Sequence, residues 1–164
     1  MKKSIIIAVV LFGLLVSTIG MTGCTSNAVP VDQNQAFLDV ITEDSPDLAD
    51  YSFAVSDHLK GRDYEGAIDA AKDLQAFSVK TKAKIEQVHP TDPLLIAARE
   101  NWLQALTKME DSAGHTKQGS EMMLRGNSAG FVAQADRGIS SAGEATALIK
   151  AANELVNKYR AGVN

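Results

Sequence analysis

The chain has 164 residues, of which 45% are hydrophobic, 22% charged and 5% aromatic. This length suits one ordinary globular domain, and the composition excludes both a disordered polymer and a polytopic membrane protein. The formal net charge of −4 at pH 7 argues against a nucleic-acid partner, because such proteins normally carry a basic excess that releases phosphate counterions.

The first residues have the layout of a secretory signal. Lys2 and Lys3 precede an uncharged, mostly apolar run over residues 5–20, and a short segment then ends at Cys24. As a helix the run would span about 24 Å, which is shorter than the roughly 30 Å hydrocarbon core of a bilayer. An uncleaved transmembrane anchor is therefore the second interpretation, after a cleaved signal.

The segment Met21-Thr22-Gly23-Cys24 resembles the lipobox of prokaryotic lipoproteins, with Met in place of the usual Leu at its first position. The resemblance implies that a thioether-linked diacylglycerol is added to Cys24. It also implies that a dedicated signal peptidase cuts between Gly23 and Cys24. The alternative is a free cysteine in an ordinary secretory leader.

The mature chain would then be an extracytoplasmic protein held at its membrane by the lipid on Cys24. Cys24 is the only cysteine, so the domain contains no disulfide and no thiolate metal cage. Without Lys2 and Lys3, 14 basic side chains remain against 20 acidic ones, a net charge of −6 that an anionic lipid surface repels. We expect residues 1–23 to be the signal peptide, 24–35 the lipidated cysteine and a flexible tether, and 36–164 the folded domain.

The domain is predicted to be all-α, an antiparallel up-down four-helix bundle. Capping residues, prolines and glycines divide it into helices over residues 46–60, 63–89, 93–125 and 128–160, with residues 35–44 extending the first helix across a break at Pro46. Gly61 and Gly126 are expected to end the first and third helices. No segment alternates apolar and polar residues as strands do.

Apolar and small residues recur at intervals of three and four along the last two predicted helices. The stripe in residues 93–125 consists of Leu95, Ala98, Trp102, Leu106, Met109, Ala113, Thr116, Ser120 and Met123. That in residues 128–160 consists of Phe131, Ala135, Gly138, Ala142, Ala145, Ile149, Ala152, Val156 and Tyr159. Folding about the turn at Gly126 should pair large residues with small ones: Trp102 with Ala152, Met109 with Ala145, Ala98 with Val156 and Thr116 with Gly138.

The sequence gives little support for a metal site or a catalytic site. Glu86 and His89 have the Glu-x-x-His spacing of ferritin-like di-metal bundles, but no second copy of that pattern occurs. We also expect no Gly-x-Ser-x-Gly nucleophile elbow, phosphate loop, metalloprotease helix or covalent haem motif. We therefore expect no enzyme, no cofactor and no resident metal.

The middle of the helix over residues 93–125 is intrinsically weak because it contains Gly114 and Gly119. A kink, a close helix–helix contact against Gly138, or a polar pocket would each account for these glycines. Close packing is the preferred interpretation. Trp102, His115, Thr116 and Ser120 form the candidate ligand pocket.

The sequence therefore favours a lipid-anchored extracytoplasmic helical bundle with a non-catalytic binding or assembly role at the cell surface. A receptor-like bundle that senses a small ligand is the alternative. A metal-binding enzyme using Glu86 and His89 is a minor one. Residues 61–68 also resemble the inter-helix turn of a tetratricopeptide repeat, but no second copy appears, so a repeat-like peptide-binding role is a further minor alternative. The ligand, any protein partner and the oligomeric state are not predicted.

Overall fold

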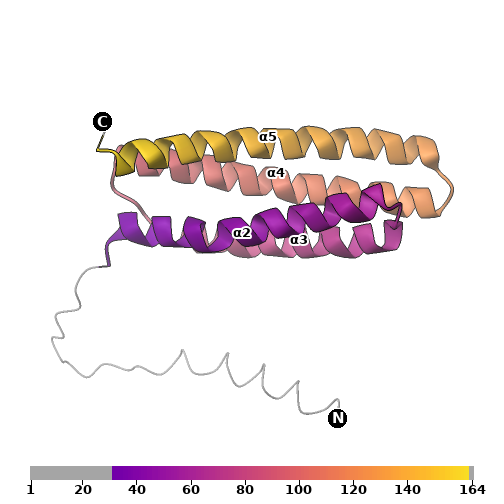
Figure 1. The fold of residues 1–164 in the computed structure, drawn as a ribbon, viewed down its shortest axis with the longest axis horizontal. Helices are drawn as coiled ribbons and strands as arrows, with labels where there is room; N and C mark the ends of the chain where they lie inside the picture. Colours follow the sequence, from indigo (N-terminus) through magenta and orange to yellow (C-terminus); the bar gives the residue numbers. More distant parts are fainter. Residues whose placement is uncertain (1–30, 163–164) are drawn as a thin grey trace, which may run out of the picture. The chain divides into compact units, whose positions relative to one another are not determined.

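The computed structural model describes residues 31–162, and this part of the chain folds as four packed helices (Figure 1). Their bounds are α2 Gln33–Lys60, α3 Tyr64–Glu86, α4 Pro93–Leu124 and α5 Ser128–Arg160. The prediction of an all-α four-helix bundle is confirmed. Caps set the helix starts, since the side chains of Asp63, Asp92 and Asn127 each accept a hydrogen bond from a first-turn backbone N–H.

Contacts between neighbouring helices show that α4 and α5 are antiparallel. Three contacts join successively later residues of α4 to earlier residues of α5: Lys108 to Glu144, Ser112 to Gly138, and His115 to Gln134. A Cβ built on Gly138 would lie 3.6 Å from Thr116 Oγ1, so this predicted pair is in contact. Trp102, Met109, Ala145 and Ala152 are all buried in the one core.

The start of α2 differs from prediction. A helix beginning at Pro46 is wrong, because Pro46 lies inside α2, which continues without a break from Gln33. The apolar residues Ile41 and Leu48 are buried on either side of it. Ser45 Oγ also donates a hydrogen bond to the backbone oxygen of Ile41. Burial of Ile41 and Leu48 outweighs the missing proline N–H.

Residues expected to belong to the tether take part in the fold. Asp32 caps α2, which begins three residues before the predicted domain boundary. Gln33 Oε1 accepts from the backbone N–H of His89, and Asn34 Oδ1 accepts from those of Thr91 and Asp92. The first turn of α2 therefore holds the loop between α3 and α4.

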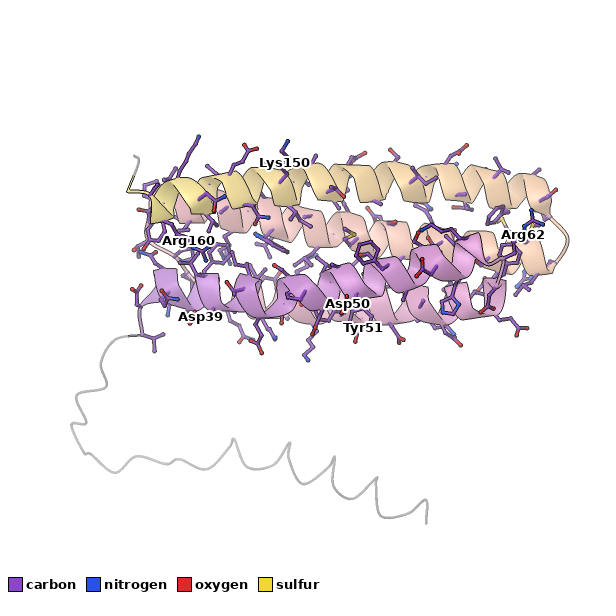
Figure 2. The ribbon with its side chains drawn as sticks, viewed as in Figure 1. Asp39, Asp50, Tyr51, Arg62, Lys150 and Arg160 are labelled. Atoms are coloured by element: carbon purple, nitrogen blue, oxygen red, sulfur yellow. The ribbon has the colours of Figure 1, made fainter. Side chains whose placement is uncertain are left out.

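A buried polar cluster joins α2 to α3. Asp44 is 4% exposed; its Oδ2 accepts a hydrogen bond from Thr81 Oγ1 at 2.8 Å, and its Oδ1 lies 2.7 Å from Lys84 Nζ. Nearer the turn, Tyr51 lies on the α3 side of α2 (Figure 2), where its ring centroid is 5.0 Å from that of Phe77. These contacts keep α2 against α3.

The α2–α3 turn and the α4–α5 turn place the left-handed backbone conformation on different types of residue. Gly126 has φ +78°, as the predicted end of α4 requires. At the end of α2, however, Gly61 has φ −72°, and the left-handed position falls on Arg62 at φ +57°. A non-glycine residue in this region is strained.

Candidate functional site: a cavity between α2 and α5

The bundle is open along one side. Within residues 31–162, no Cα atom of α2 lies within 8 Å of one of α5, whereas α4 packs closely against both α3 and α5. A cavity of about 340 Å³ occupies part of this seam. It is lined by Ser52, Val55, Ser56, Leu59, Leu74, Met109, Ser112, His115, Thr116, Gly119, Phe131, Ala135, Gly138, Ile139, Ala142 and Thr146.

The cavity forms where small residues of α5 face small residues of α4. Ala135, Gly138 and Ala142 of α5 line it together with Ser112 and Thr116 of α4. A Cβ built on Gly138 would touch its α4 neighbours at 3.5–3.6 Å, so the two backbones already approach closely. The space that larger side chains would fill therefore lies on the α2 side of α4 and α5.

Three hydroxyl groups in the lining donate hydrogen bonds to backbone oxygens. Ser52 Oγ donates to the backbone oxygen of Leu48 at 2.8 Å. Ser112 Oγ donates to that of Gly138 at 2.9 Å, and Thr146 Oγ1 to that of Ala142, also at 2.9 Å. Each hydroxyl oxygen then presents only acceptor capacity to the cavity, so these side chains make its wall mildly polar.

His115 is oriented by a partner on α5. Its Nδ1 lies 2.8 Å from Gln134 Oε1, which is an amide oxygen and can only accept. Nδ1 is therefore the donor in this hydrogen bond, and in the neutral tautomer that the bond selects, Nε2 is an acceptor. Together with the hydroxyls of Ser56 and Thr116, this ring adds further hydrogen-bonding groups to a mostly apolar wall.

None of the residues that line the cavity is an acid, a lysine or an arginine. Charged side chains lie outside it: Lys108 Nζ and Glu144 Oε2 are 2.7 Å apart across the exposed edge of α4 and α5. The hydrogen bond from Lys108 lowers the pKa of Glu144 below its ordinary value. Lys150 likewise points away from α2 (Figure 2).

A second hollow of about 270 Å³ lies further along the same seam. It is lined by Ile41, Thr42, Ser45, Asn153, Val156, Asn157 and Arg160. Both hollows bring together residues of α2 and α5, but this one is lined mainly by polar side chains. The first is the better ligand site because it is larger and mostly apolar.

The predicted pocket residues separate into two groups. His115 and Thr116 line the cavity, whereas Trp102 is 2% exposed, Ser120 is 0% exposed, and both lie in the core. The alternatives of close packing and a pocket prove compatible, since α4 approaches α5 closely at Gly138 and the cavity adjoins that contact.

The α2 wall of the cavity, formed by Ser52, Val55, Ser56 and Leu59, was not predicted as part of the site. The α5 wall left a signal in the sequence. Phe131, Ala135 and Ala142 belong to the predicted core stripe, yet the structure leaves them half-buried. These residues have the spacing of a core stripe, but their side chains have too little volume to fill this side of the bundle. That combination could have located the cavity.

The Glu86–His89 pair does not form the arrangement that its spacing suggests. α3 ends at Glu86, and Pro90 follows His89, so His89 lies in the loop and shares no helix face with Glu86. Both side chains are exposed. Among residues 31–162, no group of three or more His, Cys, Asp or Glu side chains is placed to hold a metal.

Residues 126–130, Gly-Asn-Ser-Ala-Gly, have the Gly-x-Ser-x-Gly spacing of a nucleophile elbow, which the expectation of no catalytic motif overlooks. That motif needs a strand before the serine and a helix after it. Here α4 precedes it, Asn127 caps α5, and Ser128 is the exposed first residue of that helix. The spacing therefore belongs to a helix–helix turn.

Gly23 and Cys24, the predicted cleavage and lipidation site, lie outside the described residues. Within the described part of the chain, none of the helices combines the length and the apolar character needed to span a bilayer. Comparison with known proteins gives no match to a family model, a curated protein or a solved structure.

Proposed function

We propose that this chain is a lipid-anchored extracytoplasmic protein that binds a small ligand in the cavity between α2 and α5 and does not catalyse a reaction. The observation that carries the proposal is the cavity itself. Its volume of about 340 Å³ falls in the range of ligand pockets, and hydrocarbon walls combined with a few oriented polar groups are typical of such sites.

The chemistry of the lining supports binding over catalysis. His115 is the only histidine in the lining, within residues 31–162, and its Nδ1 is held by Gln134. A hydrolytic site would need a nucleophile within hydrogen-bond reach of a base that is itself oriented. The proton of Ser112 is instead directed to a backbone oxygen, so the arrangement favours holding a ligand.

The binding half of this proposal is tested with Nile red, an uncharged apolar dye whose emission rises in hydrocarbon surroundings. The wild-type chain should bind one dye molecule in the cavity. Ala142→Leu should weaken binding about tenfold, because the larger side chain occupies the cavity. Ala133→Leu is the matched control, since Ala133 is an exposed residue of the same helix outside the lining. Equal binding by both variants would contradict the proposal.

The anchoring half is tested by cell fractionation. Wild-type protein should sediment with the membrane and carry a covalent lipid. Cys24→Ser removes the only thiol that could be alkylated. This variant should lose the covalent lipid, whereas Thr25→Ser, its neighbouring control, should retain it. A lipid-free wild-type protein would contradict the lipobox interpretation.

A further inference from the structure

The shape of the cavity, taken with the proposed function, restricts the ligand. Its lining extends from residue 131 to residue 146 on α5, which is about 22 Å at 1.5 Å per residue, and from 109 to 119 on α4, about 15 Å. On α2 it covers only residues 52–59, about 10 Å. The site is therefore an elongated channel beside α4 and α5 that α2 covers in part.

The length and the volume of the cavity together restrict what can fill it. A peptide helix about 10 Å across and 15 Å long would occupy about 1,200 Å³, far more than the cavity volume of about 340 Å³. A compact ring system of equal volume would leave the ends of the lining empty. A single file of methylene groups can follow the whole length.

The lining matches such a chain chemically. Leu59, Leu74, Met109, Phe131 and Ile139 supply hydrocarbon, and none of the lining residues carries a permanent charge. Ligand charge inside the channel would find no counter-charge, so any charged group must remain at the open side. Within the lining, Ser56, Thr116 and His115 carry hydrogen-bonding groups that a polar end can use.

We propose that the α2–α5 cavity holds one unbranched hydrocarbon chain of about 12–17 carbons, at about 1.3 Å per methylene, with its polar end at the open side of the seam. The chain can come from either of two sources that share this chemistry. One is a free single-chain lipid. The other is an acyl group of the diacylglycerol that the proposed function places on Cys24.

The first experiment measures displacement of cis-parinaric acid from the full-length protein by straight-chain alcohols of 8 to 18 carbons. Each added methylene should tighten binding about fourfold until the chain outgrows the channel, after which affinity should level off. Adamantan-1-ol, a compact alcohol, should compete poorly. If adamantan-1-ol binds and the straight chains do not, the linear-chain proposal is overturned while the proposed binding function survives.

Two variants localise the binding. Ala142→Leu should shorten the longest chain accommodated and weaken dodecan-1-ol binding at least tenfold. Ala133→Leu, outside the lining, should leave binding unchanged. Equal affinities in the two variants would show that the alcohols bind elsewhere and would overturn the proposal.

Cys24→Ser distinguishes the two sources. Binding of dodecan-1-ol to both wild type and Cys24→Ser supports a free lipid. Binding to Cys24→Ser alone supports occupation of the channel by the protein's own acyl chain. Binding to neither protein overturns the linear-chain proposal, and if Nile red also fails to bind, the proposed binding function falls with it.

Discussion

The two halves of α5 meet the rest of the bundle differently. In its second half, Ala145 and Ala152 are 0% exposed and lie in the same core as the large residues Trp102 and Met109, so no space is left beside them. In its first half, Ala135 and Ala142 line the cavity together with Ser112 and Thr116 of α4, and the space stays open. The same small residues therefore give a packed core or a ligand channel according to what stands opposite them.

The largest expected effect comes from removing the residue that fills the packed half. Trp102→Ala should lower the free energy of unfolding by about 3–5 kcal/mol, because it leaves a large cavity in a core that cannot collapse fully. Ile139→Ala, in the open half, should cost less than about 0.5 kcal/mol, since Ile139 is 71% exposed. Urea denaturation measures both. Losses of similar size would mean that the halves are packed alike.

The opposite change, from a small to a large side chain, tests the same difference between the two halves of α5. Ala145→Leu or Ala152→Leu should overpack the core and cost about 1–3 kcal/mol. Ala142→Leu makes the same change where space is available, so it should leave the melting temperature unchanged or raise it. A melting temperature unchanged in Ala145→Leu and Ala152→Leu would refute the packed register.

Substitutions of Asp44 test how firmly α2 is held to α3. If these contacts are strong, they explain why α2 stays away from α5 and the α2–α5 seam stays open. Asp44→Ala should cost about 2 kcal/mol, because the Thr81 hydroxyl, 1% exposed, loses its partner, and Lys84 loses its carboxylate. Asp44→Asn should cost less, since an amide oxygen can still accept from Thr81. Thermal unfolding of the two variants measures the difference, and equal losses would show that the Thr81 hydrogen bond contributes nothing.

The smallest effect is a pH dependence at the same contact. The hydrogen bond to Asp44 raises the pKa of Lys84 above its ordinary value of 10.5. The folded state therefore holds this proton more tightly than the unfolded state, so the stabilisation is complete below pH 10.5 and is lost as pH rises through the folded pKa. Thermal melts above pH 10 should show a smaller alkaline loss in Lys84→Met than in wild type. An unchanged loss would exclude Lys84 as a contributor.

The fold was largely predictable because local signals agreed with the final structure. Asp92 with Pro93, and Gly126 with Asn127, set helix ends that the structure reproduces within a residue. The predicted helix start at Pro46 was wrong because, in the local sequence alone, such a proline indicates the start of a helix. Burial of Ile41 and Leu48 on either side, which is a tertiary effect, carries α2 through it.

The candidate site was predictable only in part. His115 and Thr116 were found because they lie on a helix with unusual glycines. The wall that includes Val55 and Leu59 was missed because the spacing between two helices distant in sequence is not encoded in the periodicity of either one. Ser120 was placed in the pocket because it shares the stripe of Thr116, but the structure buries it completely.

A membrane-anchored bundle with a ligand in the α2–α5 cavity can be recognised by its mass. The protein is extracted gently from its native membrane and measured under native and then denaturing conditions. We expect a denatured mass that begins at Cys24 and includes acyl chains, and a native mass greater by one small apolar ligand unless the protein's own acyl chain fills the channel. A denatured mass that lacks both leader and lipid, with no added native mass, would contradict it.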